Sequence, residues 1–273
     1  TETHTKLDKL KDLLAGCESV AVAFSGGVDS TFLIAVAAEA VPGRVMAITV
    51  TAPMTPDREI RESYKIAKDL GVEQIVTGAS DIIDIEVFSE NPPDRCYHCK
   101  LHFFAVIIDA AEDIGLECVM EASNADDVDD YRPGLKAVEE LGVKSPLIEV
   151  GLTKDEIRAL SKEMGLVTWD KPSMACLASR VPYGEPVTLE KLEQIEKGEQ
   201  ILVAEGFRQC RLRHHGTFAR IEVPLEEIER LSKETVWARI AVAILDIGFE
   251  RVEIDPKGYR TGSLNEALDT GKR

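Results

Sequence analysis

Short apolar runs alternate with amphipathic stretches over the first two thirds of the chain, where apolar residues recur every three or four positions. The apolar runs predict strands and the periodic stretches predict helices. Strands are expected at 20–24, 45–50, 74–78, 118–122 and 147–150, and helices at 30–41, 56–70, 97–114 and 154–164. Such alternation predicts an α/β fold, a doubly wound parallel sheet with helices on both faces.

Two of these helices have recognisable starts. Thr55 followed by Pro56 predicts an N-cap with proline at the first helical position. Thr153 and Glu156 have the spacing of a capping box, in which each side chain bonds the backbone N–H of the other residue.

The pattern changes at the segment 169–186, which contains three prolines and a glycine. After it the chain predicts a helix, two strands around Gly216, a long helical stretch and a last strand, at 189–205, 209–214, 218–223, 225–247 and 251–254. We therefore expect a domain at 1–168, a cysteine-bearing connection at 169–188 and a smaller α+β domain at 189–273.

Composition narrows the class of protein. The chain is 44% hydrophobic and 30% charged, and it has no run of about 18 apolar residues, so we expect a cytoplasmic protein without a membrane span. The formal net charge is −17; residues 1–180 carry 18 Lys and Arg against 32 Asp and Glu. Because nucleic-acid binding needs a basic face, this balance favours a small-molecule substrate over RNA or DNA.

The clearest motif follows the first predicted strand and opens the first helix after it. Its residues run Phe24-Ser-Gly-Gly-Val-Asp-Ser30. Two glycines allow the backbone to close around an anion, and a helix N-terminus directs N–H groups at it. Ser25 and Ser30 add hydroxyl donors, and Asp29 suits Mg²⁺. An ordinary glycine-rich turn is the alternative, which the strand–loop–helix context disfavours.

A second polar cluster follows the strand predicted at 118–122. Asn124 and Asp127 are candidates for positioning Mg²⁺–pyrophosphate, and Arg132 for neutralising phosphate charge. The alternative is a solvated acidic loop.

Three of the six cysteines suggest chemistry. Cys96 and Cys99 form a CxxC pair, compatible with zinc, a redox dithiol or an iron–sulfur cluster. Cys176 lies far downstream among proline, small residues and Arg180, typical of an exposed loop whose cations stabilise a thiolate. Three thiolates would leave one iron of a [4Fe–4S] cluster open to carry sulfide. Cys17 and Cys118, by contrast, are expected to be small buried hydrophobic residues.

The motif at 25–30 resembles the PP-loop of the ATP pyrophosphatase superfamily, over about residues 17–168. The resemblance implies cleavage of ATP to AMP and pyrophosphate, with AMP passed to a substrate oxygen. It places the nucleotide on Ser25, Gly26, Gly27, Asp29 and Ser30, with adenine near Ala23, Thr49 and Thr51.

Together with the cluster at 124–134, the segments 172–184 and 210–216 resemble the LarE family over nearly the whole chain. The resemblance implies a sulfur transferase that adenylates a carboxylate of pyridinium-3,5-biscarboxylic acid mononucleotide and releases a thiocarboxylate, in a homo-oligomer such as a hexamer. In one branch the counterpart of Cys176 gives up its own sulfur. Because Cys96 and Cys99 are present, the chain resembles the other branch, in which the three cysteines bind a [4Fe–4S] cluster and a sulfide donor supplies sulfur.

Alternation along the strand at 209–214 directs Arg211 and Arg213 to one side. With Ser179 and Arg180 they would form a receptor for the substrate's phosphate and carboxylate. Glu199 and Glu222 are candidates for orienting these arginines or for an ion site. A solvated charged strand face is the alternative.

Three other functions remain open on sequence alone. A PP-loop tRNA thiolase shares the adenylation chemistry but requires a basic RNA-binding surface. An amidating ligase that uses ammonia requires none of Cys96, Cys99 and Cys176. A nucleotide sensor with a structural zinc would release no pyrophosphate.

Overall fold

The computed structural model describes residues 1–128, 133–172, 175–260, 262 and 264. The chain forms two compact units, Thr1–Ile82 with Asp94–Met174 and Ile83–Pro93 with Ala175–Arg273, and each is described by itself. Among the described residues, every helix is too short or too polar to cross a membrane.

The larger unit is built on a four-stranded parallel sheet with the strand order β3-β2-β1-β4. Its strands are β1 (Val20–Ala23), β2 (Val45–Thr51), β3 (Glu73–Gly78) and β4 (Cys118–Met120). Val20 stands opposite Val45 on one side and Cys118 on the other. The predicted doubly wound fold is confirmed, because the chain runs outward from β1 to β3 and then returns to the other side of β1.

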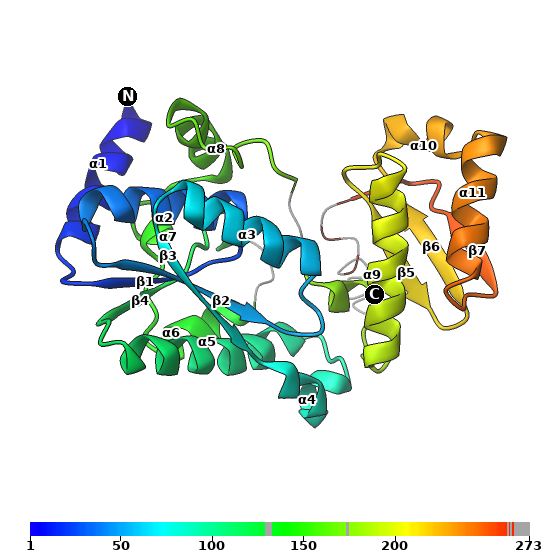
Figure 1. Ribbon diagram of the computed structural model, residues 1–273, viewed down its shortest axis with the longest axis horizontal. Coiled ribbons are helices and arrows are strands. Elements are labelled where there is room, and N and C mark those ends of the chain that lie inside the picture. The colour runs from blue at the N-terminus through cyan, green and yellow to red at the C-terminus, as the bar shows by residue number, and fades with distance from the viewer. Residues whose placement is uncertain (129–132, 173–174, 261, 263, 265–273) are drawn as a thin grey trace, which may run out of the picture. The chain divides into compact units, whose positions relative to one another are not determined.

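Helices cover both faces of this sheet, as Figure 1 shows. On one face lie α1 (Glu2–Ala15), α2 (Val28–Ala40), α3 (Asp57–Asp69) and α8 (Lys154–Glu163), and on the other α5 (Arg95–Asp113) and α6 (Gly134–Glu140). Each face buries its own core: Val20 and Val22 pack toward the first set of helices and Ala21 toward the second.

The strand predicted at 147–150 is wrong. Those residues belong to a short helix, α7 (Pro146–Glu149), which has proline at its start. Beside the sheet the chain makes an isolated bridge between Met120 and Lys144 and then turns into this helix. Residues 147–150 are three apolar residues and one glutamate, and so short a segment fits a helical turn as well as a strand, which explains the error.

Of the two predicted helix starts, one is confirmed and one is displaced, and the structure adds a helix at the N-terminus. Thr153 and Glu156 form the predicted capping box, with the Thr153 N–H donating to Glu156 Oε2 at 3.0 Å. The start predicted at Thr55 is displaced, because Pro56 is the N-cap and no side chain caps α3. Helix α1 was not predicted, since only Leu10 and Leu14 of its residues are buried.

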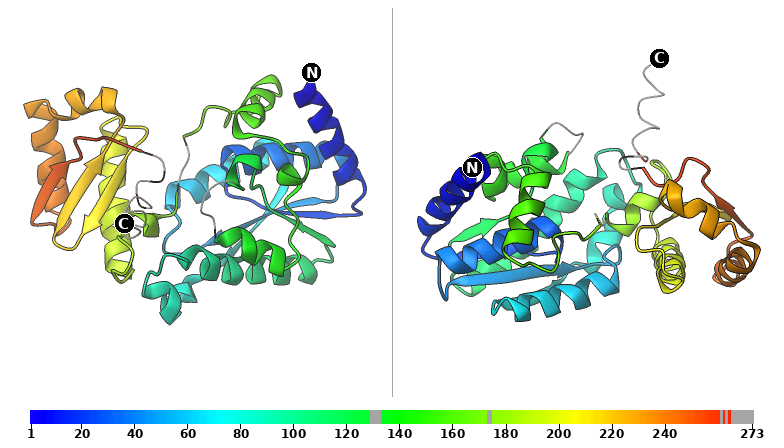
Figure 2. Two further views of the ribbon diagram at one scale, coloured as in Figure 1. Left: turned by 180° about the vertical axis from the view of Figure 1, so that it is seen from behind. Right: turned by 90° about the horizontal axis from the view of Figure 1, so that it is seen from above.

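The smaller unit holds a three-stranded sheet with the order β5-β6-β7. The first two strands pair antiparallel and the last two parallel. The strands are β5 (Arg211–His215), β6 (Phe218–Glu222) and β7 (Arg251–Ile254), and the helices are α4 (Glu86–Ser89), α9 (Leu189–Ala204), α10 (Leu225–Leu231) and α11 (Glu234–Leu245). Helices α9 and α11 pack along this sheet (Figure 2). The helical stretch predicted at 225–247 consists of two helices.

Residues 83–93 belong to the smaller unit although they lie within the first third of the sequence. The buried Asn91, at a φ of 59°, holds them there. Its side-chain amide donates to the carbonyls of Pro182 and Glu185 at 2.7 and 3.0 Å. The order of elements along the chain does not show that residues 83–93 belong to the smaller unit. The domain boundaries at 168 and 188 stay a prediction.

Candidate active site

The phosphate loop lies at the point where the strand order of the larger sheet reverses. Strand β1 has β2 on one side and β4 on the other, so the successive connections leave β1 in opposite directions. Open parallel sheets bind ligands at this position, beyond the carboxyl ends of the strands. Residues 24–27 occupy it and lead directly into α2.

Close packing shapes the loop itself. Gly26 has a φ of 68°, and a side chain there would bring its Cβ to 3.0 Å from Ser63 Cα, so the position requires glycine. The Ser25 and Ser30 hydroxyls lie 3.1 Å apart, and the Gly27 N–H donates to Ser25 Oγ at 3.3 Å. Gly27 is the N-cap of α2 and no side chain caps the helix, which suits an anion at the first-turn N–H groups.

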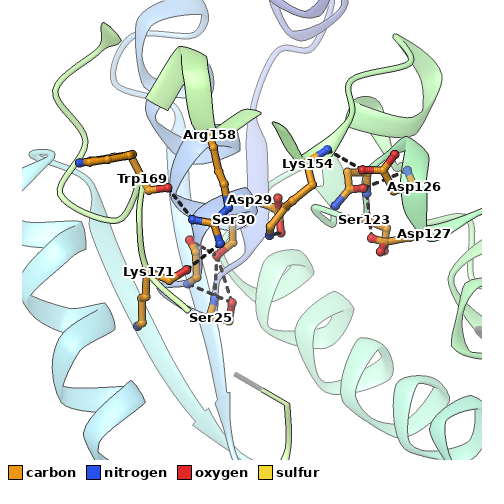
Figure 3. Close-up of polar contacts among 12 residues, drawn as sticks. Ser25, Asp29, Ser30, Ser123, Asp126, Asp127, Lys154, Arg158, Trp169 and Lys171 are labelled. Carbon is orange, nitrogen blue, oxygen red and sulfur yellow. Dashed lines mark hydrogen bonds and ion pairs between the residues drawn. The ribbon is translucent and has the colours of Figure 1, made fainter. Parts of the chain in front are cut away.

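Asp29, in the first turn of α2, has two differently placed carboxylate oxygens (Figure 3). Oδ2 lies 2.5 Å from the Nζ of Lys154 at the start of α8. Oδ1 is buried and has no hydrogen-bond partner among the described residues. A buried carboxylate oxygen without a partner fits a hard cation such as Mg²⁺, which prefers oxygen ligands.

The polar cluster after β4 is ordered by its own hydrogen bonds. Asn124 and Asp127 are both buried, and Asn124 N–H donates to Asp127 Oδ2 at 3.0 Å. Asp126 Oδ2 accepts from the Lys154 N–H at 2.8 Å, which links the cluster to the lysine that holds Asp29. Contacts of Asn124 and Asp127 with Mg²⁺–pyrophosphate stay a prediction, and Arg132 lies outside the described residues.

Glu121 directly follows β4, just before the residues of this cluster. Its buried carboxylate accepts from the hydroxyls of Ser123 and Ser145 at 2.7 and 2.6 Å and from Lys100 Nζ at 3.4 Å. Lys100 lies one residue beyond Cys99, so this network connects the CxxC helix to the end of β4. Neither Lys100 nor Glu121 was predicted as a site residue.

The residues expected near adenine differ in exposure. Thr49 is buried and its hydroxyl donates to the Phe24 carbonyl at 2.6 Å, so it supports the phosphate loop from behind. Thr51 lines an open hollow of about 500 Å³ at the ends of β2 and β3. Ile60 and Arg61 of α3 also line it. Adenine binding by Ala23, Thr49 and Thr51 stays a prediction.

Two basic residues that sequence reasoning missed contact the loop or its support. Lys171 Nζ donates to the Gly26 carbonyl at 3.1 Å. Arg158 of α8 donates to the carbonyls of Trp169 and Lys171 at 2.6 and 2.8 Å. No periodicity or motif marks Lys171, because its partner lies 145 residues earlier in the chain.

The cysteines fall in both units. Cys96 is exposed and Cys99 half-buried in the first turns of α5, three residues apart and so on one face of the helix. Cys176, in the smaller unit, is exposed at the N-cap of a 3-10 turn, Leu177–Arg180. Within the described residues no group of three or more His, Cys, Asp and Glu side chains is arranged to hold a metal ion. Cys17 is buried, as predicted, whereas Cys118 is only half-buried because β4 is an edge strand.

Arg180 orders the segment around Cys176. It is fully buried, and its guanidinium pairs with both carboxylate oxygens of Glu199 at 2.7 and 2.9 Å. It also donates to the carbonyls of Ala175 and Cys176 at 2.7 and 3.1 Å. Burial opposes the charged form, but the Glu199 carboxylate raises the pKa of Arg180 above its ordinary value.

The other two predicted receptor arginines lie on β5. Arg213 forms a two-point ion pair with Glu222 on β6, at 2.9 and 3.0 Å, and donates to the Ser179 carbonyl at 2.6 Å. Arg211 is buried, lies over the Tyr259 ring, and has a pKa lowered by burial and by nearby Arg180. Glu199 and Glu222 thus orient arginines in the structure, while substrate binding by Ser179 and the three arginines stays a prediction.

Residues 8–98 match the asparagine synthase family model, which covers the phosphate loop. The chain is 35% identical over 272 residues to pyridinium-3,5-bisthiocarboxylic acid mononucleotide synthase of Lactiplantibacillus plantarum, covering 98% of this chain and 95% of that protein. The chain belongs to the LarE family. It is accordingly an ATP-dependent sulfurtransferase of the PP-loop type.

Two further proteins are similar to this chain. An uncharacterized protein of Synechocystis, slr1717, is 34% identical over 265 residues, with 97% of this chain and 98% of that protein covered. A glutamine-hydrolyzing GMP synthase of Aeropyrum pernix is 27% identical over 200 residues, which cover 67% of this chain and 39% of that enzyme. The similarity to the amidating enzyme is thus partial, whereas similarity to the LarE protein runs nearly end to end.

Proposed function

We propose that this protein adenylates a carboxylate of pyridinium-3,5-biscarboxylic acid mononucleotide and converts it to a thiocarboxylate. The observation that carries this proposal is the near full-length similarity to the Lactiplantibacillus synthase. The phosphate loop supports it with the chemistry that adenylation requires, an anion cradle beside a carboxylate suited to Mg²⁺.

In the first step a substrate carboxylate oxygen attacks the α-phosphorus of ATP. The bond from that phosphorus to the bridging oxygen breaks, pyrophosphate leaves, and an acyl adenylate forms. Negative charge grows on the departing pyrophosphate, so the loop N–H groups, the Ser25 and Ser30 hydroxyls and Lys154 would stabilise the transition state. Asp29 would hold Mg²⁺, which would neutralise part of the phosphate charge.

In the second step sulfur attacks the acyl carbon and AMP leaves, which exchanges the activated oxygen for sulfur. Cys96, Cys99 and Cys176 would hold a [4Fe–4S] cluster, since thiolates are the ligands that such a cluster requires and none of the three forms a disulfide. Such a cluster would supply sulfide to the acyl carbon. Without it, the Cys176 thiolate attacks instead and forms a thioester; a base then removes the Cα proton, the Cβ–Sγ bond breaks as a Cα=Cβ bond forms, and the thiocarboxylate leaves dehydroalanine at position 176.

One experiment tests the reaction and another its sulfur source. Anaerobically purified protein with ATP, Mg²⁺, sulfide and the mononucleotide should release pyrophosphate and yield a product with sulfur in place of oxygen, detected by mass spectrometry. Pyrophosphate release with bulk tRNA and none with the mononucleotide would contradict the proposal in favour of a tRNA thiolase. Iron and acid-labile sulfide, measured in the parent and in Cys96→Ala, decide between the cluster and single-use donation by Cys176.

The homo-oligomeric assembly expected for the family is a further prediction, which light scattering would check.

A further inference from the structure

Lys171 makes three contacts that match the three N–H donors of its ammonium group. Nζ lies 3.1 Å from the Gly26 carbonyl oxygen, 2.7 Å from Glu59 Oε2 and 2.8 Å from Glu62 Oε2. The side chain is only 14% exposed. A lysine normally keeps its ammonium in water, so this placement is specific to the site.

The bond to Gly26 sets the direction of a loop donor. The Gly26 carbonyl and the Gly27 N–H belong to one trans peptide, and in a trans peptide these two groups point in opposite directions. Holding the carbonyl toward Lys171 therefore turns the Gly27 N–H away from Lys171. That N–H belongs to the N-cap of α2, and its bond to Ser25 Oγ is long, at 3.3 Å, so an anion can share it.

This peptide needs an external anchor because glycine lies on both sides of it. Glycine reaches positive and negative φ with similar ease, so a Gly-Gly peptide can rotate more freely than others. Packing against Ser63 restricts the position of Gly26 but does not bond its carbonyl. Lys171 supplies that bond.

The anchor is itself held firmly. Arg158 donates to the backbone carbonyl of Lys171 at 2.8 Å and to that of Trp169 at 2.6 Å. The ammonium of Lys162 lies over the Trp169 ring, 4.4 Å from its centroid. Figure 3 shows Arg158, Trp169 and Lys171 beside the loop residues Ser25 and Ser30. These contacts hold the backbone of residues 169–171 against α8, and the Lys171 side chain extends from this backbone to Gly26.

Charge at this cluster argues against direct phosphate binding by Lys171. Its single positive charge faces two carboxylates, Glu59 and Glu62, and Arg58 lies 3.6 Å from Glu59. No net positive charge remains on Lys171 and its two partners for an anion. These contacts therefore favour a role for Lys171 in orienting the loop.

We propose that Lys171 is a positioning residue of the phosphate loop, which holds the Gly26–Gly27 peptide so that the Gly27 N–H faces the pyrophosphate portion of ATP. The inference rests on the proposed function for the reaction that uses this loop. It adds a residue that acts through the backbone, without touching nucleotide.

The test compares two ligands on folded protein. Inorganic pyrophosphate with Mg²⁺ and AMP serve as probes in titration calorimetry of the parent, Lys171→Met and a matched control, Lys65→Met, an exposed lysine of α3 paired with Asp69. Lys171→Met should weaken pyrophosphate binding about tenfold or more, the size of a hydrogen bond to a charged group, and AMP binding less than threefold. The control should match the parent. Equal losses for both ligands, or none, would overturn the inference.

Two further variants distinguish an effect on the orientation of the loop from an effect of charge. They also keep the inference testable if Lys171→Met does not fold. Glu59→Gln keeps an oxygen that accepts from Nζ, so pyrophosphate affinity should stay within threefold of the parent. A marked tightening would show that charge decides and would contradict positioning. Lys171→Arg keeps the charge without the three-acceptor geometry and should still lose affinity for pyrophosphate.

These binding measurements need no carboxylate substrate, so they test the positioning role of Lys171 independently of the proposed reaction. A parent protein whose pyrophosphate affinity depends on Lys171 but which makes no thiocarboxylate would refute the proposed reaction alone. A Lys171→Met protein that binds pyrophosphate normally, from a parent that makes thiocarboxylate, would refute only the positioning role.

Discussion

Lys154 Nζ lies 2.5 Å from Asp29 Oδ2, so the carboxylate that sequence analysis assigned to Mg²⁺ already holds a cation from α8. The other oxygen, Oδ1, is buried without a hydrogen-bond partner among the described residues. Asp29 thus offers one oxygen to Lys154 and one to a metal ion. Nucleotide phosphates entering the loop would meet both positive charges at one carboxylate.

Replacing Lys154 by methionine should slow adenylation while leaving the carboxylate available to metal. We expect the rate of substrate-dependent pyrophosphate release to fall about 100-fold, the effect of losing one preorganised donor to a developing charge. Mg²⁺ alone should bind more tightly, because the competing ammonium is gone. Pyrophosphate release and Mg²⁺ titration calorimetry measure the two effects, with Lys65→Met as the control. Weaker Mg²⁺ binding in the variant would contradict this competition.

Removing Arg180 should destabilise the smaller unit strongly. Arg180→Met leaves the carboxylate of Glu199, which is 5% exposed, without its ion-pair partner. Breaking one side of a buried pair costs about 3–5 kcal/mol. Urea unfolding should show this loss for Arg180→Met and a smaller one for the double variant Arg180→Met/Glu199→Met, in which no buried charge is left alone. A loss below about 1 kcal/mol in the single variant would mean that Glu199 finds another partner.

Local signals explain which parts of the site were predictable. The phosphate loop, β1 and the capping box of Thr153 each depend on residues within about one helical turn of each other, so the sequence shows them directly. Lys154 and Lys171 reach Asp29 and Gly26 from 125 and 145 residues away, through packing of α8 and the segment after it. No pattern in the sequence specifies such distant contacts.

Conflicting local signals explain the errors in the fold. The mostly apolar segment at 147–150 follows Pro146, and proline at the first helical position favours the helix that the structure shows. Residues 83–93 joined the smaller unit through Asn91, whose side chain bonds carbonyls about 90 residues later. Glu199 and Glu222, which the sequence made candidates for orienting the arginines, do pair with Arg180 and Arg213, whereas strand alternation alone predicts only the side of β5 on which Arg211 and Arg213 lie.

Thiol reactivity should follow burial and pKa. Burial and the neighbouring Cys118 raise the pKa of Cys17 to about 11, and Cys210 is buried on the other unit. Because the thiolate is the reacting form, iodoacetamide at pH 8 should modify the exposed Cys96 and Cys176 of cluster-free protein first and Cys17 and Cys210 last. Peptide mass spectrometry over time measures the order, and unfolded protein, with all six modified together, is the control. Early modification of Cys17 would contradict the packing beside β1.

The smaller unit should lose stability in mild acid through His214. Burial, and then nearby Lys191, lower the pKa of His214 to about 4, and its Nε2 lies 3.0 Å from Gln194 Oε1. The unfolded chain, with an ordinary pKa near 6.5, binds the proton more readily than the folded one, so stability is constant above that pH and falls below it. From pH 7.5 to 5 the free energy of unfolding should drop by about 2 kcal/mol on this account. Urea unfolding of the parent and His214→Gln at both pH values isolates this residue from other titrating groups. Equal pH dependence in the two proteins would show that His214 protonates without opposing the fold.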